Sequence, residues 1–272
     1  MPPAIIHTGD TLMAELKDAV LSITGRDAVV RKRKRPDLVA DMIRERIIGA
    51  HMRPGDRIPA DWLTPQTLGV SRGTVREALK VLEYQGLITS KTGPGGGVFI
   101  CEVRPVDAIQ MLDNLFLFKA PTIADIYAIR KKLEPELAAS VAGHLSEQAM
   151  AALQNTIRLY EKEPKTAEEE YSQRLAELDF HAELASHCDN MLLGFMCRFL
   201  VSLLRDMTVC REIYREPNSE LRETGLHYQI RLLRAINAGH ADKAREIMYV
   251  HMVEAEKYML EMAAIRAPGE DD

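Results

Sequence analysis

The stretch GVSRGTVREALKVLEYQGLITSKTGPGGGVFI, residues 69–100, has the pattern of one amphipathic helix followed by two short strands. Val75, Leu79 and Leu82 recur at helical spacing, and Ser71 before them is a good N-cap residue. LITSK and GVFICEV follow as short β-prone runs around TGPGG, which predicts a hairpin. A nucleotide-binding glycine loop would open directly into a helix, so the glycines here indicate a tight connection between two strands.

Two further helices are expected before this stretch. The first begins after the basic run RKRKR at 31–35, and its apolar residues at helical spacing are Leu38, Met42, Ile43, Ile47 and Ile48. The second covers roughly 61–69, with either Asp61 or Thr64 as its cap and Pro65 suited to a first turn. Three short helices followed by a hairpin predict a winged helix-turn-helix domain, with LGVS as the tight turn between the second and third helices.

The start of the third helix is predicted to meet DNA. Its polar residues are Ser71, Arg72, Gly73, Thr74 and Arg76. Hydroxyl groups and the helix N-terminus can bind phosphate oxygens, and arginine can bind guanine or phosphate through two parallel hydrogen bonds. The alternative is a set of solvated polar residues at an ordinary helix start. The turn and the hairpin flanking this helix favour the recognition role.

The charge distribution agrees with a polyanionic partner. The whole chain carries a net charge of -5, but residues 31–104 contain 14 Lys and Arg against 8 Asp and Glu, a net of +6. The remainder carries 21 against 32, a net of -11. Arg35, the last residue of the basic run, is expected to add phosphate contacts that do not depend on sequence, unless the run is a solvated tail. No signal peptide or spanning segment is recognisable, so we expect a cytoplasmic protein without a membrane partner.

The C-terminal half is expected to be helical throughout. Apolar residues at three- and four-residue spacing predict helices at 121–145, 146–163, 168–188, 191–215, 219–238 and 241–266. The predicted fold is therefore mainly α: a winged helix-turn-helix with a small β-hairpin wing, and an all-α helical bundle. The expected division is an extension at 1–30, a DNA-binding domain at 31–103, a linker at 104–120, an all-helical domain at 121–266, and a tail at 267–272. The resemblance given below for the helical domain implies that it binds an effector and dimerises.

The N-terminal motifs resemble the GntR family of bacterial transcription regulators. The resemblance covers residues 36–100 and rests on RPGDRIP, LGVSRGTVREALKVLEYQGLI and TGPGGGVFI. It implies that Arg72 and Arg76 read DNA and that Lys91, Thr92 and Gly93 form the tip of a wing near the minor groove. The stretch PADWLTPQT departs from the family pattern, because Trp62 stands where family members often have an arginine that contacts DNA.

The C-terminal half resembles the FCD effector domain of the FadR subfamily. The motifs are IYAIRKKLEPELAASVA, ELDFHAELASHCDNMLL and LLRAINAGHADKAREIMYVHM. The resemblance implies a divalent metal held by one Asp and three His, together with an arginine that binds a ligand carboxylate. Carried over, these roles fall on Glu177, His181, Gln229, His251 and Arg130, with Glu177 in place of the Asp and Gln229 in place of the middle His.

The chemistry of these residues leaves alternatives open. Glu177 and His181 are four residues apart, so they share a helical face and could bind Zn, Mn or Ni with His251. The same residues could instead form a metal-free polar pocket for an organic effector, or the histidines could be satisfied core residues. Arg130 could bind a carboxylate, or it could pair with Glu134 one helical turn away.

Together these features predict a homodimeric, ligand-responsive transcription regulator. Two reader domains would bind a palindromic operator, and a small organic acid would bind the helical domain. Repression is the commoner outcome in such families. A metal-dependent enzyme using Glu177, His181 and His251 is the main alternative, although no HExxH or other catalytic pattern accompanies the cluster. An architectural DNA-binding protein without a ligand response is the third.

Overall fold

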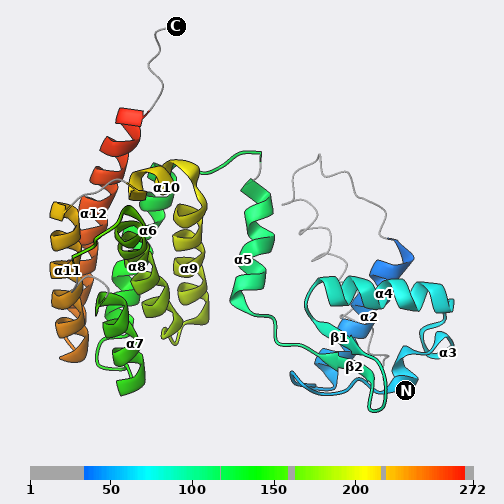
Figure 1. Cartoon of the computed structure of the whole chain (residues 1–272). Helices are drawn as coiled ribbons and strands as arrows, with labels where there is room; N and C mark the ends of the chain where they lie inside the picture. The colour runs from blue at the N-terminus through cyan, green and yellow to red at the C-terminus, as the bar shows by residue number, and fades with distance from the viewer. Residues whose placement is uncertain (1–33, 117, 159–162, 216–218, 267–272) are drawn as a thin grey trace, which may run out of the picture. The chain divides into compact units, whose positions relative to one another are not determined.

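The computed structural model describes residues 34–116, 118–158, 163–215 and 219–266 (Figure 1). The chain divides into two compact units, one ending at Val103 and the other beginning at Arg104. The predicted extension at 1–30, the first three residues of the basic run and the predicted tail at 267–272 lie outside the described residues. The two units are described separately below.

The first unit is a winged helix-turn-helix. Its elements are α2 (Arg35–Gly49), η1 (Ala60–Leu63), α3 (Pro65–Leu68), α4 (Arg72–Tyr84), β1 (Ile88–Lys91) and β2 (Gly97–Ile100). Thr64 caps α3 by accepting a hydrogen bond from the Thr67 N–H, so Thr64 and not Asp61 begins this helix. Gly69 follows α3 with a φ of 64°, a left-handed conformation that glycine adopts without strain. The chain therefore turns sharply into α4.

The hairpin is antiparallel, with Ile88 opposite Ile100 and Lys91 opposite Gly97. Its loop closes through a hydrogen bond from the Gly96 N–H to the Gly93 carbonyl oxygen, at 2.8 Å. At Gly96 the backbone is so crowded that a Cβ atom would lie 2.5 Å from the Lys91 carbonyl oxygen. This glycine is therefore required by the shape of the loop itself.

The helix α2 buries only Ile43 and Ile47 of the five apolar residues predicted to form its stripe. Val39, Ala40, Ile43 and Ile47 face the core, whereas the predicted core residues Leu38, Met42 and Ile48 are 48%, 50% and 64% exposed, respectively. The prediction joined large apolar residues from two neighbouring faces of the helix into one stripe. The face that packs on α4 is centred on Ile43 and Ile47, and a helix advances by about 100° per residue, so small Ala40 is buried in place of Met42.

The second unit is an all-helical bundle. Its elements are α5 (Pro105–Asp113), η2 (Asn114–Phe116), α6 (Ile123–Ser140), α7 (Glu147–Arg158), α8 (Ala167–Ser186), α9 (Met191–Asp206), α10 (Thr208–Arg215), α11 (Ser219–Asn237) and α12 (Ala241–Arg266). The single helix predicted at 191–215 is two helices, because Met207 has an extended ψ of 126° that interrupts the helical path. The segment 104–120, predicted as a linker, contains α5 and η2, and Ile109 of α5 is buried in this unit's core.

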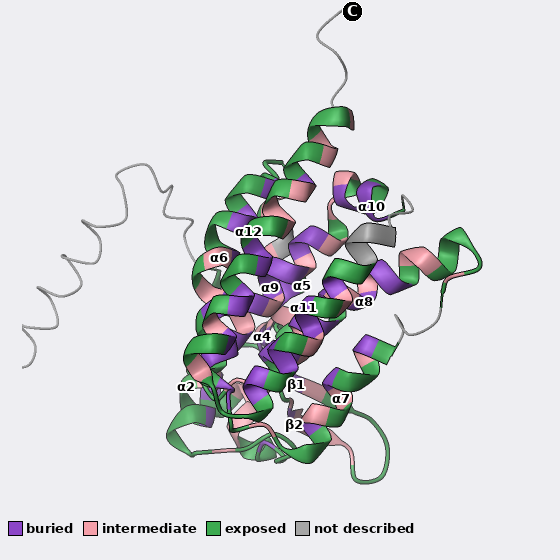
Figure 2. Ribbon diagram, turned by 90° about the vertical axis from the view of Figure 1, so that its left-hand side faces the viewer, coloured by how far each residue is buried: buried purple, intermediate pink, exposed green. Residues whose placement is uncertain are grey.

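The long helices of the bundle run beside one another. The helix α12 packs along α6 and also against α11, while α8 packs against α9. Buried residues line the inward sides of these helices and exposed residues the outward sides (Figure 2). Among the described residues, no helix combines the length and the apolar character needed to cross a membrane.

Candidate functional site

The N-terminus of α4 presents polar groups to solvent. Arg72, Gly73 and Arg76 are exposed, and so is the cap residue Ser71. The Ser71 Oγ accepts a hydrogen bond from the Thr74 N–H at 3.2 Å and lies 3.0 Å from the Thr74 Oγ1. Only one of these two hydroxyl groups can donate to the other, so one hydroxyl proton stays available for an external acceptor. The helix start therefore offers charged and neutral donors together.

The hairpin and the start of α2 add further exposed donors to the same unit. Lys91, Thr92 and Gly93 are exposed where β1 enters the loop, and Arg35 is exposed as the first residue of α2. Trp62, which replaces the expected arginine, lies under the guanidinium of Arg46, whose Cζ is 4.2 Å from the ring centroid. A cation thus still lies at this position, supplied by α2 instead of η1.

The second unit encloses a small cavity of about 60 Å³. Its walls come from α6, α8, α10, α11 and α12. The cavity brings together four of the predicted effector residues, namely Arg130, Glu177, His181 and His251. Three of these side chains, all but Glu177, are less than a tenth exposed, so a ligand in the cavity would be largely removed from water.

His181 is held from both sides of its ring. Its Nδ1 lies 2.5 Å from the Oε2 of Glu134, and its Nε2 lies 3.0 Å from the hydroxyl oxygen of Tyr228. Glu134 also accepts a hydrogen bond from Nε of Arg130. Burial raises the pKa of Glu134, but the charges of Arg130 and His181 outweigh that effect and lower it to about 2. Glu134 is therefore an ionised carboxylate that fixes the orientation of both neighbours.

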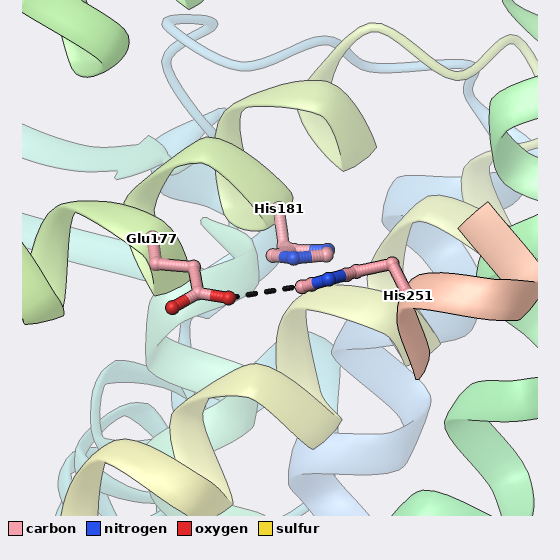
Figure 3. A group of neighbouring side chains, drawn as sticks. All are labelled: Glu177, His181 and His251. Atoms are coloured by element: carbon pink, nitrogen blue, oxygen red, sulfur yellow. Dashed lines mark ion pairs between the residues drawn. The ribbon is translucent and has the colours of Figure 1, made fainter. Parts of the chain in front are cut away.

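Glu177 and His251 meet across the cavity from α8 and α12. The Glu177 Oε1 lies 3.3 Å from the His251 Nε2 (Figure 3). Burial raises the pKa of Glu177, whereas the hydrogen bond from His251 and the charges of His251, Arg174 and His181 lower it to about 2. Burial lowers the pKa of His251. One ligating atom from each of Glu177, His181 and His251 lies within 4.8 Å of the others, so the three side chains can share one cation.

Two predictions for this region have mixed outcomes. Arg130 makes the predicted ion pair with Glu134 and at the same time lines the cavity, and its Nη2 has no hydrogen-bond partner among the described residues. Gln229 is fully buried but is not among the cavity-lining residues, while His227 is exposed. Neither amide atom of Gln229 has a hydrogen-bond partner within the described part of the chain.

Sequence reasoning missed two functional side chains of the site. Tyr228 stacks on His251 with ring centroids 3.4 Å apart and reaches His181 with its hydroxyl group. Arg174 lines the cavity from α8, one turn before Glu177, and is only 2% exposed. Arg174 gave no signal in the sequence, because an arginine on a helix is usually solvated. Tyr228 gave no sequence signal either, because its contacts depend on how α11 packs on α12.

An exposed basic helix start beside a wing defines a DNA-binding unit, and a buried polar cavity in a helical bundle defines a ligand-binding unit. The first unit therefore places the chain in the class of DNA-binding regulators. The sequence matches the bacterial regulatory proteins of the gntR family over residues 37–100 and the FCD domain over residues 125–254. The protein therefore belongs to the GntR family and carries an FCD domain.

Curated relatives agree over most of the chain. The HTH-type transcriptional regulator LutR of Bacillus subtilis is 26% identical over 211 residues, which cover 77% of this chain and 94% of LutR. The putative L-lactate dehydrogenase operon regulatory protein of Escherichia coli is 29% identical over 230 residues, covering 82% and 86%. The Glc operon transcriptional activator of Escherichia coli is 27% identical over 210 residues, covering 74% and 81%.

A solved structure has the same fold. The GntR protein of Streptococcus agalactiae superposes with a TM-score of 0.57 at 18% identity, over 82% of this chain and 99% of that protein. Family and relatives alike are transcription regulators, so the polar cluster in the FCD domain is not the active site of a metal-dependent enzyme. The protein is a DNA-binding transcription regulator of the GntR family.

Proposed function

We propose that the protein is a homodimeric regulator that binds a palindromic operator and changes its DNA affinity when a small carboxylate enters the FCD cavity. The observation that carries the proposal is the buried arginine Arg130, which lines that cavity with an unpaired Nη2 donor. A charged donor in such a place favours an anionic partner. Because the partner of the reader unit is bacterial DNA, the protein acts in the cytoplasm.

The proposed DNA contacts lie at the start of α2, the start of α4 and the tip of the hairpin, and all but half-buried Thr74 are exposed. They are Arg35, Ser71, Arg72, Gly73, Thr74, Arg76, Lys91, Thr92 and Gly93. The operator can be found by selecting bound sequences from a random DNA library with the full-length protein. A palindromic consensus, together with a dimer mass in sedimentation, is the expected result. A consensus without two-fold symmetry or a monomer on DNA contradicts the dimer proposal.

The proposed effector binds through Arg130 and the donors of the cavity. One relative is named for an L-lactate dehydrogenase operon, which makes L-lactate a reasonable first probe. Ligand binding to the folded state raises its thermal stability, so a melting-temperature screen of carboxylic acids is a direct test. We expect at least one small carboxylate to stabilise the protein and to change its operator affinity. If none does either, the effector proposal is wrong.

We further propose that Glu177, His181 and His251 hold a divalent transition metal such as Zn, Mn or Ni. Their ligating atoms lie close enough together, and Glu134 orients His181 as carboxylates commonly orient metal-binding histidines. The metal would supply a positive charge for a ligand carboxylate. It would have to displace the Tyr228 hydroxyl group from the His181 Nε2. Gln229 is buried beside the cavity walls without lining them, so its side chain would have to turn toward the cavity to join the proposed site.

The metal proposal has a test that does not need the effector. Elemental analysis of the purified protein should find about one divalent metal per chain, and a strong chelator should lower the melting temperature. The variant His251→Ala should lose the metal, whereas replacement of the exposed His227 should not. The proposal is wrong if the metal-free protein has the same melting temperature and the same response to carboxylates as the metal-loaded protein.

For the direction of regulation we propose repression, which is the commoner outcome in families of this kind. The same architecture occurs in a relative named as an activator, so the direction needs its own measurement. A reporter gene placed behind the selected operator should be expressed more strongly when the regulator is deleted. Weaker expression on deletion would mean activation and would leave the DNA-binding proposal intact.

A further inference from the structure

The cavity contains a second buried arginine that neither the family pattern nor the proposed metal site uses. Arg174 projects from α8 and is 2% exposed. Its guanidinium lies between the rings of Tyr214 and Tyr258, with its Cζ 5.5 Å from each centroid. These aromatic faces can hold the flat cation in place, but they accept none of its N–H groups in ordinary hydrogen bonds.

The donors of Arg174 lack acceptors. Its Nε, Nη1 and Nη2 are all buried, and none has a hydrogen-bond partner among the described residues. Leaving a buried donor unsatisfied destabilises the fold, and more strongly so for a charged group. Glu177 lies one turn further along α8, but its carboxylate is directed to His251. An arginine with three unused donors in a cavity wall is therefore suited to bind an anionic ligand.

Arg130 and Arg174 differ in how their charges are balanced. Arg130 shares Glu134 and keeps an unpaired Nη2, while Arg174 has no hydrogen-bonded carboxylate within the described chain. The two arginines come from different helices, α6 and α8, and line the same cavity. One carboxylate on Arg130 would leave the donors of Arg174 unsatisfied. A second anionic group on the same ligand would satisfy them.

We propose that the effector of this protein carries two anionic groups, one bound by Arg130 and the other by Arg174. The inference rests on the proposed effector function of the cavity and narrows its ligand class. A short dicarboxylate and a short acid with both a carboxylate and a phosphate share this chemistry, because guanidinium groups bind both kinds of anion through paired hydrogen bonds.

Matched pairs of probes test the inference on the full-length protein. Succinate is compared with butyrate, and phosphoglycolate with glycolate, by titration calorimetry. Within at least one pair we expect the dianion to bind about tenfold more tightly than its monoanionic partner, because a second charge-assisted interaction forms. Preference within the first pair identifies a dicarboxylate effector, and preference within the second a phosphorylated one. Equal affinities in both pairs overturn the inference, but monoanion binding would leave the effector function standing.

Variants then assign the preference to its residue. Arg174→Gln should bind the preferred dianion no more tightly than the monoanion, with monoanion affinity unchanged. Arg158→Gln on α7, an exposed arginine away from the cavity, should behave as the original protein. If Arg174→Gln does not fold, Arg174→Lys keeps the charge without the planar fork and should lose at least about threefold in dianion affinity. A dianion preference that survives either folded variant overturns the role of Arg174. Failure of all four probes to bind counts against both the inference and the carboxylate effector.

Discussion

The reading surface of the first unit and the cavity of the second use similar side chains in opposite ways. Arg72 and Arg76 at the start of α4 are exposed, and the only ion-pair contact of Arg76 among the described residues, to Glu77, spans 3.9 Å. Arg130 and Arg174 are nearly inaccessible to water, and among the described residues Nη2 of Arg130 and all three guanidinium nitrogens of Arg174 lack acceptors. Water can satisfy the donors of an exposed arginine, whereas the free donors of a buried one need an acceptor from a bound group.

Substitutions at the two places should therefore change different quantities, DNA affinity in the first unit and folding stability in the second. Removing an exposed reader should weaken binding and leave the fold alone, because water already satisfied the side chain. Removing a member of the buried network should weaken the fold itself, because its neighbours lose partners that water cannot replace.

Glu134→Ala should destabilise the second unit most strongly. The substitution leaves Arg130 and His181 buried without their shared carboxylate. Breaking a buried ion pair by removing one partner typically costs about 3–5 kcal/mol. Chemical denaturation followed by circular dichroism measures the free energy of unfolding. Glu136→Ala, two residues further on α6 at an exposed ion pair with Arg245, is the control and should change it by less than about 1 kcal/mol. Equal effects of the two variants would contradict the buried-network interpretation.

Arg72→Ala should weaken operator binding without changing stability. Loss of an arginine that reads a base typically costs about 1–3 kcal/mol of binding free energy and relaxes specificity. Fluorescence anisotropy on the selected operator and on scrambled DNA measures both quantities. Arg53→Ala removes the same charge from an exposed loop of the same unit and is the control. An unchanged operator affinity for Arg72→Ala would remove this residue from the recognition surface.

Gly96→Ala should distort the wing. The added Cβ atom would lie 2.5 Å from the Lys91 carbonyl oxygen and 2.8 Å from that of Gly93, so the loop must shift. We expect a loss of about 1 kcal/mol in stability, at the lower end for overpacking because the loop lies at the surface, together with weaker DNA binding. Gly49→Ala, with no atom within 4 Å of its added Cβ, is the matched control and should be tolerated. A wild-type melting curve and operator affinity for Gly96→Ala would show that the loop shape is unimportant.

Lys91→Gln should have the smallest effect. Lys91 is exposed and its Nζ lies 4.9 Å from the Phe99 ring centroid, so the substitution does not disturb the core. Loss of a phosphate contact lowers affinity about equally for all DNA sequences. It also reduces the slope of log affinity against log salt concentration by about one unit. Titrations at several salt concentrations measure that slope. A change limited to one operator position would instead indicate base reading.

The first unit could be predicted from sequence almost completely. Helix ends are marked in the sequence by Gly69, Ser71 and Gly86, and the hairpin is marked by two short β-prone runs around glycines. These elements could therefore be predicted without knowing any long-range contact. The error in α2, where Leu38 and Met42 are exposed, arose because burial depends on where α4 packs. Local signals therefore determine the elements, and tertiary packing selects which face is buried.

The cavity could be predicted only in part. Glu177 and His181 share a face at four-residue spacing, and His251 was found through the family resemblance. The double engagement of His181 by Glu134 and Tyr228 joins three helices that are far apart in sequence. Arg174 was overlooked because an arginine on a helix is usually solvated, and only the bundle shows that this one is buried.

Ligand binding in the cavity is proposed to change the affinity of the first unit for its operator, and one measurement tests this coupling. Operator affinity is measured by anisotropy with and without the carboxylate that best stabilises the protein, for the original chain and for Arg130→Gln. We predict that the ligand changes the affinity of the original chain by about 5- to 150-fold, the usual range of allosteric coupling. Arg130→Gln leaves Glu134 without one of its buried partners and should be less stable, so it is compared at a temperature where circular dichroism shows it folded. There it should bind the operator without ligand and should not respond to the ligand. An original chain whose operator affinity ignores the ligand, or a variant that responds equally well, would contradict the claim.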